Sequence, residues 1–389
     1  MSAHYSVAIL QCLVHHVYLS CISNLTPSRH FCSPTAPCRV ALPLLAPFRT
    51  LKLVSSLWKS VADEYKIDTF FLNVEEGVYY PHAWHINTRL RKAVLLSRYR
   101  IFRTIDSDGG TSNRGVYVAY DFGGSAGCAG ASEVVIKAWV SGSDVEYHRE
   151  AAAYKLLRGC PGVPATLQGA QYEPLCDVHI LPMQKLGPSL EDLMSLLPNR
   201  QFDLRMVLTV AIQMTERYRD IHARGVIHSG AKPGNICFAP RSDAPGTLYA
   251  IDFGFSLALA DNLLIPSAHR IDSVGNRRFM SVLAHHGISK SQRDDLESLG
   301  YLLSYLFHGQ LPWDPPRPVR SRSIATPASK IFEGMDACFH EFWRDVKALA
   351  YGEVPDYEKL RGRFAVCLQQ HEKGCAPYDW WDIWDQFNS

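Results

Sequence analysis

Two short apolar runs, each ending in a polar side chain, constrain this chain more than any other feature of its sequence. Residues 226–235 are Val-Ile-His-Ser-Gly-Ala-Lys-Pro-Gly-Asn, and residues 248–254 are Leu-Tyr-Ala-Ile-Asp-Phe-Gly. Asn235 and Asp252 are therefore 17 residues apart (252 − 235). Oxygen ligands at the ends of two such runs can meet on one hard cation, and Mg²⁺ is a cation of this kind. The sequence thus predicts a magnesium site formed by these two residues.

A lysine at the end of an apolar strand is the second feature. Residues 133–137 are Glu-Val-Val-Ile-Lys, which is the pattern of a buried strand. A charge in such a position needs a partner, because burying it alone is costly. Glu150 lies 13 residues further on (150 − 137), in a helical run at residues 146–157. We therefore expect an ion pair between Lys137 and Glu150.

These landmarks resemble those of protein kinases, where they occur in the same order. In that family the strand lysine meets the phosphates of ATP, and the Asn and the Asp of Asp-Phe-Gly hold the metal that bridges them. The resemblance assigns nucleotide binding to Lys137 and Glu150. It assigns metal binding to Asn235 and Asp252, and it places Lys232 in the catalytic loop. The implied cofactors are ATP and Mg²⁺.

Three further stretches narrow the resemblance to the casein kinase I group. They are Met-Gln-Lys-Leu-Gly-Pro-Ser-Leu-Glu-Asp-Leu at 183–193, Gly-Asn-Arg-Arg-Phe-Met-Ser at 275–281 and Gln-Arg-Asp-Asp-Leu-Glu-Ser-Leu-Gly-Tyr-Leu at 292–302. By this resemblance Met183 faces the adenine pocket, and the segment from Gln184 to Leu186 offers backbone groups to the base. The same residues also fit a turn that ends in a Ser-capped helix without any ligand. Arg278 falls on the phosphate-binding arginine of the group, which implies phosphorylated substrates.

The resemblance implies an α+β, bilobal protein kinase fold with a small strand-rich lobe and a larger helical lobe. We place the kinase-like domain at residues 97–382, with its lobes at 97–184 and 185–382. Residues 1–50 are rich in Pro, Cys and Ser and show no sustained period, so a disordered leader is expected. Residues 51–96 are expected to form an extension whose fold the sequence does not define.

The catalytic loop departs from the family at one decisive place. Gly230 stands where kinases have the catalytic Asp, and Ser229 stands where they have the Arg before it. Neither a glycine nor a serine hydroxyl can accept a proton at neutral pH. Loss of a general base costs ~10²–10⁴-fold in rate. The sequence therefore predicts an ATP-binding, casein kinase I-like protein whose transfer of phosphate to Ser/Thr is impaired, as in a pseudokinase.

Two other functions stay open at this point. Phosphoryl transfer depends largely on positioning and charge, so an active Ser/Thr protein kinase is the first alternative. The second is an interaction scaffold that binds no nucleotide. A degraded glycine-rich hairpin favours the scaffold, since Gly109, Gly110 and Gly115 lack the family spacing. Asp106 and Asp108 add negative charge where phosphate would lie, so the hairpin also fits a solvated tip.

Two amphipathic or apolar runs predict the helices of the larger lobe. Residues 203–224 carry an apolar stripe and end before Gly225, which is typical of a core helix. Residues 295–307 are apolar on nearly every side, so this helix should form the buried axis. Asp295 at its start is expected to hold the backbone of the catalytic loop. His228 is expected to be a buried structural residue.

Composition excludes several other classes of function. Among 389 residues, 40 Lys and Arg balance 38 Asp and Glu, so nothing favours nucleic acid as the main partner. The eleven cysteines include no Cys-x-x-Cys pair, which argues against a disulfide framework or a zinc site. No apolar run is long enough to span a membrane. We expect a monomer in the cytoplasm or nucleus, with a protein partner that is acidic or phosphorylated; Arg317, Arg320 and Arg322 could contact it.

Overall fold

The computed structural model describes residue 90 and residues 93–106, 114–123, 132–142, 144–174, 176–243, 246–258, 277–314, 326–371 and 379–388. Contacts divide the chain into two units, Met1–Pro81 and His82–Ser389, and the described residues belong to the second. Several features from the sequence lie outside the described residues: the 1–50 leader, most of 51–96, Gly109, Gly110, Asp108, Arg317, Arg320 and Arg322.

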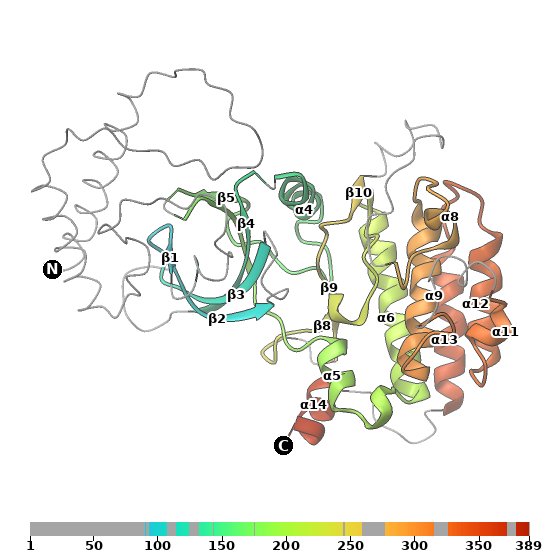
Figure 1. Cartoon of the computed structure of the whole chain (residues 1–389). Coiled ribbons are helices and arrows are strands. Elements are labelled where there is room, and N and C mark those ends of the chain that lie inside the picture. The colour runs from blue at the N-terminus through green and yellow to red at the C-terminus, as the bar shows by residue number, and fades with distance from the viewer. Residues whose placement is uncertain are drawn as a thin grey trace, which may run out of the picture. The chain divides into compact units, whose positions relative to one another are not determined.

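A six-stranded antiparallel sheet begins the described fold, in the order β1-β2-β3-β4-β6-β5 (Figure 1). Its strands are β1 (Val94–Leu95), β2 (Tyr99–Asp106), β3 (Arg114–Asp121), β4 (Ser132–Val140), β5 (Gln171–Glu173) and β6 (Val178–Gln184). Strand β4 confirms the strand predicted from the apolar run at residues 133–137. The sheet also takes in β1, which falls within the segment expected to be an extension.

The two faces of the sheet serve different cores because side chains alternate along each strand. On β4, Val134, Ile136 and Ala138 join a cluster confined to the sheet and the residues beside it. Trp139 lies on the opposite face of the strand and joins the main core. Lys137 lies on the same face as Trp139, and its side chain therefore points toward the rest of the domain.

Helix α4 (Asp144–Leu156) lies against this second face of the sheet (Figure 1). Tyr147 packs its ring edge-on against Trp139, with 5.4 Å between ring centroids, and stacks on His179 at 4.4 Å. Such aromatic pairs add stabilisation beyond the area that they bury. The contacts fix α4 relative to β4, which is the arrangement that an ion pair between the two elements needs.

The second half of the chain is helical. Its longer helices are α5 (Leu190–Leu196), α6 (Leu204–His222), α9 (Gln292–His308), α12 (Ala337–Ala348), α13 (Tyr357–His371) and α14 (Trp380–Asn388), with α8 (Val282–His285) and α11 (Ala328–Ile331) as single turns. Helix α6 packs against α9 and α13, and α12 packs against α9 and α13. Nearly every residue of α9 is buried, which confirms it as the central axis. None of the helices in the described part of the chain is long and apolar enough to cross a membrane.

Two small antiparallel pairs shape the loops between α6 and α9. Strand β7 (Val226–Ile227) pairs with β10 (Leu257–Ala258), and β8 (Ile236–Phe238) pairs with β9 (Leu248–Ala250). The 3₁₀ turn η2 (Pro233–Asn235) leads into β8. The β8–β9 pairing places Asn235, just before β8, beside Ile251 and Asp252, which follow β9.

Candidate functional site

Lys137 is the centre of a group of three charges, in which Lys137 and Glu150 are buried and Asp252 is partly exposed. Its Nζ lies 2.6 Å from Oε2 of Glu150 and 2.6 Å from Oδ1 of Asp252. Lys137 is 6% exposed and Glu150 is fully buried. The ion pair expected between Lys137 and Glu150 is thus present, while Asp252 is a second partner that the sequence analysis did not foresee.

The three side chains of this group differ in how strongly their surroundings favour the charged form. Burial opposes the charged form of Lys137, but the nearby carboxylates of Asp252 and Glu150 outweigh it and raise its pKa. Burial likewise acts against ionised Asp252, yet Lys137 lowers its pKa well below the usual range. Glu150 is different, because burial raises its pKa to about 7. Among the described residues, its Oε1 atom has no hydrogen-bond partner. Asp252 is therefore the firmly ionised partner of Lys137.

The Asp-Phe-Gly segment is held against α4. Asp252 has φ 66°, a left-handed conformation that Asp tolerates better than most residues. Phe253 is fully buried, and its ring lies edge-on to those of Tyr154 at 5.1 Å and His228 at 4.9 Å. At Gly254, a Cβ atom would lie 2.8 Å from Oε1 of Glu146 on α4. A side chain at this position would therefore require the end of the Glu146 side chain to move.

His228 is a buried structural residue, as expected. Its ring nitrogens are both engaged, since Nδ1 accepts from the backbone N–H of Gly230 at 3.1 Å and Nε2 lies 3.0 Å from the carbonyl oxygen of Ile251. This arrangement fits a neutral ring with its proton on Nε2. Burial lowers the pKa of His228, which also favours the neutral form. The ring therefore has no nitrogen left to serve a substrate.

Asp295, at the start of α9, holds the backbone of the catalytic loop. Its carboxylate accepts the N–H of His228 and the N–H of Ser229, each at 2.7 Å, and lies 2.8 Å from Nε2 of His222. Burial acts to raise the pKa of Asp295, but the hydrogen bonds from His222 and from the backbone N–H of Ser229 help to lower it overall. The contact expected from the sequence is present, and it fixes Ser229 at φ 60°.

Asn235 lies beside the start of the Asp-Phe-Gly segment. Ile236 pairs with Ala250 in the β8–β9 register, and the N–H of Ile251 donates to the carbonyl oxygen of Asn235 at 3.0 Å. The side-chain Nδ2 of Asn235 donates to the carbonyl oxygen of Gly230 at 2.8 Å. Its Oδ1 is then turned away from that bond, and it is the atom suited to a metal. Asn235 is 4% exposed, so the side chain is well fixed.

Lys232 is the other charged residue of this loop. It is half-buried and precedes η2 in an extended conformation. Its positive charge contributes to the lowered pKa of Asp252, after burial and the larger effects of Lys137. The structure therefore brings Lys232 to the same site as Asp252 and Lys137.

Gly230 lies at the position that the sequence analysis matched to the catalytic Asp of kinases. Its φ lies outside the left-handed region, so its backbone suits any residue. A Cβ atom there would lie 3.1 Å from Cε1 of His228 and 3.3 Å from Nδ2 of Asn235, which is tight but close to ordinary contact. Beside it, the Ser229 hydroxyl is buried without a partner among the described residues. A cavity of about 10 Å³ lies next to Ser229 and is lined also by Lys290 and Asp294.

The segment that follows β6 is fixed at both ends. Met183 is buried and pairs with Val135 across the sheet. The N–H of Gln184 donates to the carbonyl oxygen of Ala165 at 2.8 Å. The N–H of Gly187 donates to the carbonyl oxygen of Phe238 at 3.0 Å. Leu186 lies half-buried between these two anchors. Contact of Met183, Gln184 and Leu186 with a nucleotide base stays a prediction.

The glycine-rich hairpin is described in its two strands, β2 and β3, whereas its loop at residues 107–113 lies outside the described residues. Gly115 lies in β3, where the hydroxyl of Tyr117 occupies the space that a Cβ atom would need. Packing alone therefore accounts for glycine at this position, and a role in phosphate binding stays a prediction. Arg114, at the start of the same strand, forms an ion pair with Glu146 of α4.

Arg278 has a partner that the sequence analysis did not foresee. Its Nε lies 2.7 Å from Oδ1 of Asp314, and its Nη2 bonds Oδ2 of the same carboxylate. The guanidinium also lies over the ring of Tyr305 at 4.2 Å. A phosphate at Arg278 would have to compete with this two-pronged ion pair.

Comparison with known proteins supports a kinase. No family model matches the chain. It is 33% identical over 245 residues to "Casein kinase I homolog 3" of Schizosaccharomyces pombe, which covers 59% of this chain and 55% of that protein. It is 32% identical over 252 residues to "Casein kinase I homolog 1" of the same yeast, covering 61% and 56%. The chain thus spans about half the length of the curated relatives it matches. The strand-rich part followed by the helical part, taken together with the similarity to these relatives, is the bilobal protein kinase fold.

Proposed function

We propose that this chain binds ATP with Mg²⁺ in a casein kinase I-like domain, and that its transfer of phosphate to protein Ser/Thr is impaired. The observation that carries the proposal is the contrast between two parts of the site. Lys137, Glu150 and Asp252 form a complete charge group. Gly230 offers no side chain where the general base belongs. The similarity to casein kinase I homologues supports the choice of family.

The side chains present fit a metal-bound nucleotide. Asp252 and Asn235 are oxygen donors, which Mg²⁺ prefers, and Lys137 supplies an ammonium for phosphate oxygens. In the described structure the ammonium contacts Asp252, and a phosphate would bring further negative charge to the same cation. The bound ion would neutralise charge on the phosphates. The segment Gln184–Leu186 would offer backbone groups to the base.

The environment of Gly230 supports the loss of proton transfer. A general base must lie within hydrogen-bond reach of the substrate hydroxyl and must have a free lone pair. His228 is the nearest candidate to replace it, but both its nitrogens are engaged by Gly230 and Ile251. Ser229 is a hydroxyl and does not accept a proton at neutral pH. We therefore expect a rate reduced ~10²–10⁴-fold, with residual activity from positioning and charge.

The remaining features of the function are proposed from the family. We propose protein substrates or partners that are acidic or phosphorylated, a monomeric state, and residence in the cytoplasm or nucleus. The near balance of 40 basic and 38 acidic residues supports proteins over nucleic acid as partners.

Two measurements on the purified chain test the proposal. The first is the melting temperature with and without Mg·ATP, because a ligand that binds only the folded state stabilises it by mass action. We expect a rise with Mg·ATP and none with Mg²⁺ alone. The second is transfer of labelled phosphate from ATP to an acidic protein substrate, where we expect a low rate. Absence of a melting shift at millimolar Mg·ATP would favour a nucleotide-free scaffold, and a rate typical of kinases would favour the active enzyme.

A further inference from the structure

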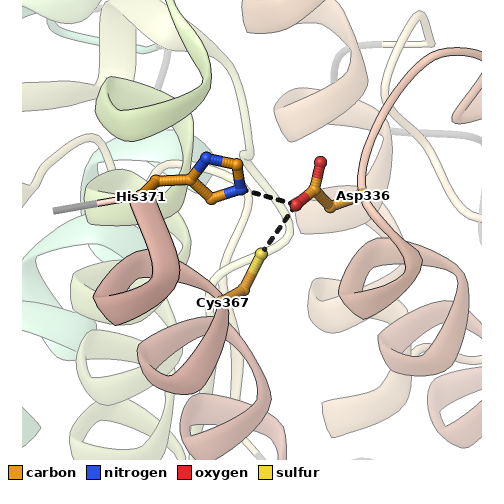
Figure 2. A group of neighbouring side chains, drawn as sticks. All are labelled: Asp336, Cys367 and His371. Carbon is orange, nitrogen blue, oxygen red and sulfur yellow. Dashed lines mark hydrogen bonds and ion pairs between the residues drawn. The ribbon is translucent and has the colours of Figure 1, made fainter. Parts of the chain in front are cut away.

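Three side chains with different metal-binding atoms meet between helices α12 and α13. Asp336 is the residue just before α12, and Cys367 and His371 lie near the end of α13. Cys367 and His371 are four residues apart (371 − 367), so they project from the same face of the helix. Figure 2 shows the three side chains pointing toward one another, with the Asp336 carboxylate joined by dashed lines to the His371 ring and to the Cys367 sulfur.

The distances in this group are close to those of a metal site. Nε2 of His371 lies 2.7 Å from Oδ2 of Asp336, and Sγ of Cys367 lies 3.2 Å from the same oxygen. All three ligand atoms lie within 4.8 Å of one another. Around a tetrahedral zinc ion, with bonds near 2.0–2.3 Å, ligand atoms are roughly 3.3–3.8 Å apart. Small side-chain rotations therefore suffice to place an ion between them.

Cys338 provides a fourth candidate ligand. It lies in the first turn of α12, two residues after Asp336, and its thiol is hydrogen-bonded with that of Cys367, although it lies outside the group of three whose ligand atoms are all within 4.8 Å of one another. Cys338 and Cys367 are buried, and neither is in a disulfide. Burial raises the pKa of Cys367 to about 11, so both groups are thiols in the absence of a cation. The four side chains Asp336, Cys338, Cys367 and His371 are called the α12–α13 cluster below.

We propose that the α12–α13 cluster is a structural zinc site. A combination of thiolate, imidazole and carboxylate ligands suits Zn²⁺, whereas Mg²⁺ and Ca²⁺ require oxygen ligands alone. Four protein ligands leave no open position, which is typical of a structural site rather than a catalytic one. Zinc would join the first turn of α12 to the last turns of α13. The cluster shares no residue with the candidate nucleotide site, so this proposal does not depend on the proposed function.

The candidate zinc ligands do not follow the usual Cys-x-x-Cys pattern because they lie on two different helices. Structural zinc sites are recognised by Cys-x-x-Cys pairs on tight turns. Here two ligands are four residues apart on a helix, while Asp336 and Cys338 are two residues apart at the start of another helix. Packing of α12 against α13 then brings the two pairs together.

The first experiment measures the metal content of the full chain, purified without a chelator and without a histidine tag. We expect about one zinc per chain by elemental analysis. After removal of the metal, Co²⁺ should bind and give a thiolate-to-cobalt absorption band, which reports sulfur ligation. A chain that carries no zinc and gives no such band with Co²⁺ would overturn the proposal.

Variants of the cluster decide whether any zinc is bound there. Cys367→Ser and His371→Asn should each lower zinc affinity by roughly tenfold or more, in titrations against a chromophoric chelator. His371 is partly exposed, so its variant should fold, and far-UV circular dichroism checks this. Cys160→Ser is the matched control, because Cys160 is a buried free cysteine outside the cluster. Equal zinc binding in all these variants, or a Cys338–Cys367 disulfide in the zinc-treated protein, would contradict the proposal.

Discussion

Lys137 and Asp252 are 115 residues apart in the sequence, yet Nζ of one lies 2.6 Å from Oδ1 of the other. The contact joins the sheet to the Asp-Phe-Gly segment, and Glu150 joins the same ammonium to α4. Three elements thus share one buried cation. Loss of the Lys137 ammonium would leave the carboxylates of Glu150 and Asp252 close together without the cation that they share.

Lys137→Met should therefore affect both stability and binding. Removing one partner of a buried ion pair costs ~3–5 kcal/mol, because the remaining charge stays buried. We expect that loss in denaturant unfolding, together with loss of the melting shift by Mg·ATP. Lys185→Met is the matched control: Lys185 pairs with Glu133 at the surface, and exposed pairs contribute roughly 0–1 kcal/mol. Similar unfolding free energies for the two variants would contradict this account of the group.

Glu150 should make stability depend on pH in a defined direction. Burial raises its pKa from 4.5 to about 7 in the folded chain. The unfolded chain therefore releases this proton at lower pH than the folded chain, so the folded state binds more protons within the window. The contribution of Glu150 to stability is fully present below about pH 4.5 and is lost as the pH rises through about 7.

The difference between the wild type and Glu150→Gln isolates this effect. Relative to the Gln variant, the wild type should lose unfolding free energy as the pH is raised across the window. Glu133→Gln serves as the control, because Glu133 is an exposed carboxylate outside the Lys137 group. A wild type whose stability rises across the window relative to Glu150→Gln would show that Glu150 is ionised throughout.

Local patterns explain which parts of the fold and site could be predicted. Apolar alternation located the strands around Lys137, and the amphipathic stripe located α6, since both signals lie within one element. The Lys137–Glu150 pair followed because its two residues lie on consecutive elements. The contact with Asp252 could not follow in this way, because it depends on how distant loops pack.

The same limit applies to Arg278 and to the α12–α13 cluster. Arg278 was matched by resemblance to a phosphate-binding arginine, but Asp314, 36 residues later, folds back onto it. The sequence around Arg278 and the sequence around Asp314 give no sign that these two residues pair. For the cluster, the four-residue spacing of Cys367 and His371 on a helix was a visible signal. The position of Asp336 relative to them is set by tertiary packing alone.

The ion pair of Arg278 leads to a prediction about phosphorylated ligands. A guanidinium can hold a phosphate with two hydrogen bonds, but here both prongs contact Asp314. Asp314→Asn keeps an acceptor for the N–H of Leu311 and removes the competing charge. We expect it to raise affinity for a phosphorylated acidic peptide, measured by fluorescence anisotropy, and to leave the unphosphorylated peptide unchanged. Arg278→Ala should abolish the gain. If Asp314→Asn binds both peptides as the wild type does, Arg278 is a structural residue only.

The last prediction concerns Gly230 and the missing base. Gly230→Asp restores a carboxylate at the position that should orient the substrate hydroxyl and take its proton, and the backbone there is compatible with any residue. The new Cβ atom lies 3.1 Å from Cε1 of His228, so the ring must shift by a few tenths of an ångström. We expect phosphate transfer to an acidic substrate to rise by at least about tenfold, within the range for a general base.

Gly230→Asn is the matched control for this variant, because it has the same shape and cannot accept a proton. If only the Asp variant gains activity, proton transfer was the missing step. Both variants should still show the melting shift with Mg·ATP, since Lys137, Asn235 and Asp252 are unchanged. A Gly230→Asp chain that binds Mg·ATP and still transfers no phosphate would place the deeper defect elsewhere. The hairpin that contains Gly115 would then be the next part of the site to change, since the family's phosphate-covering glycines are out of spacing there.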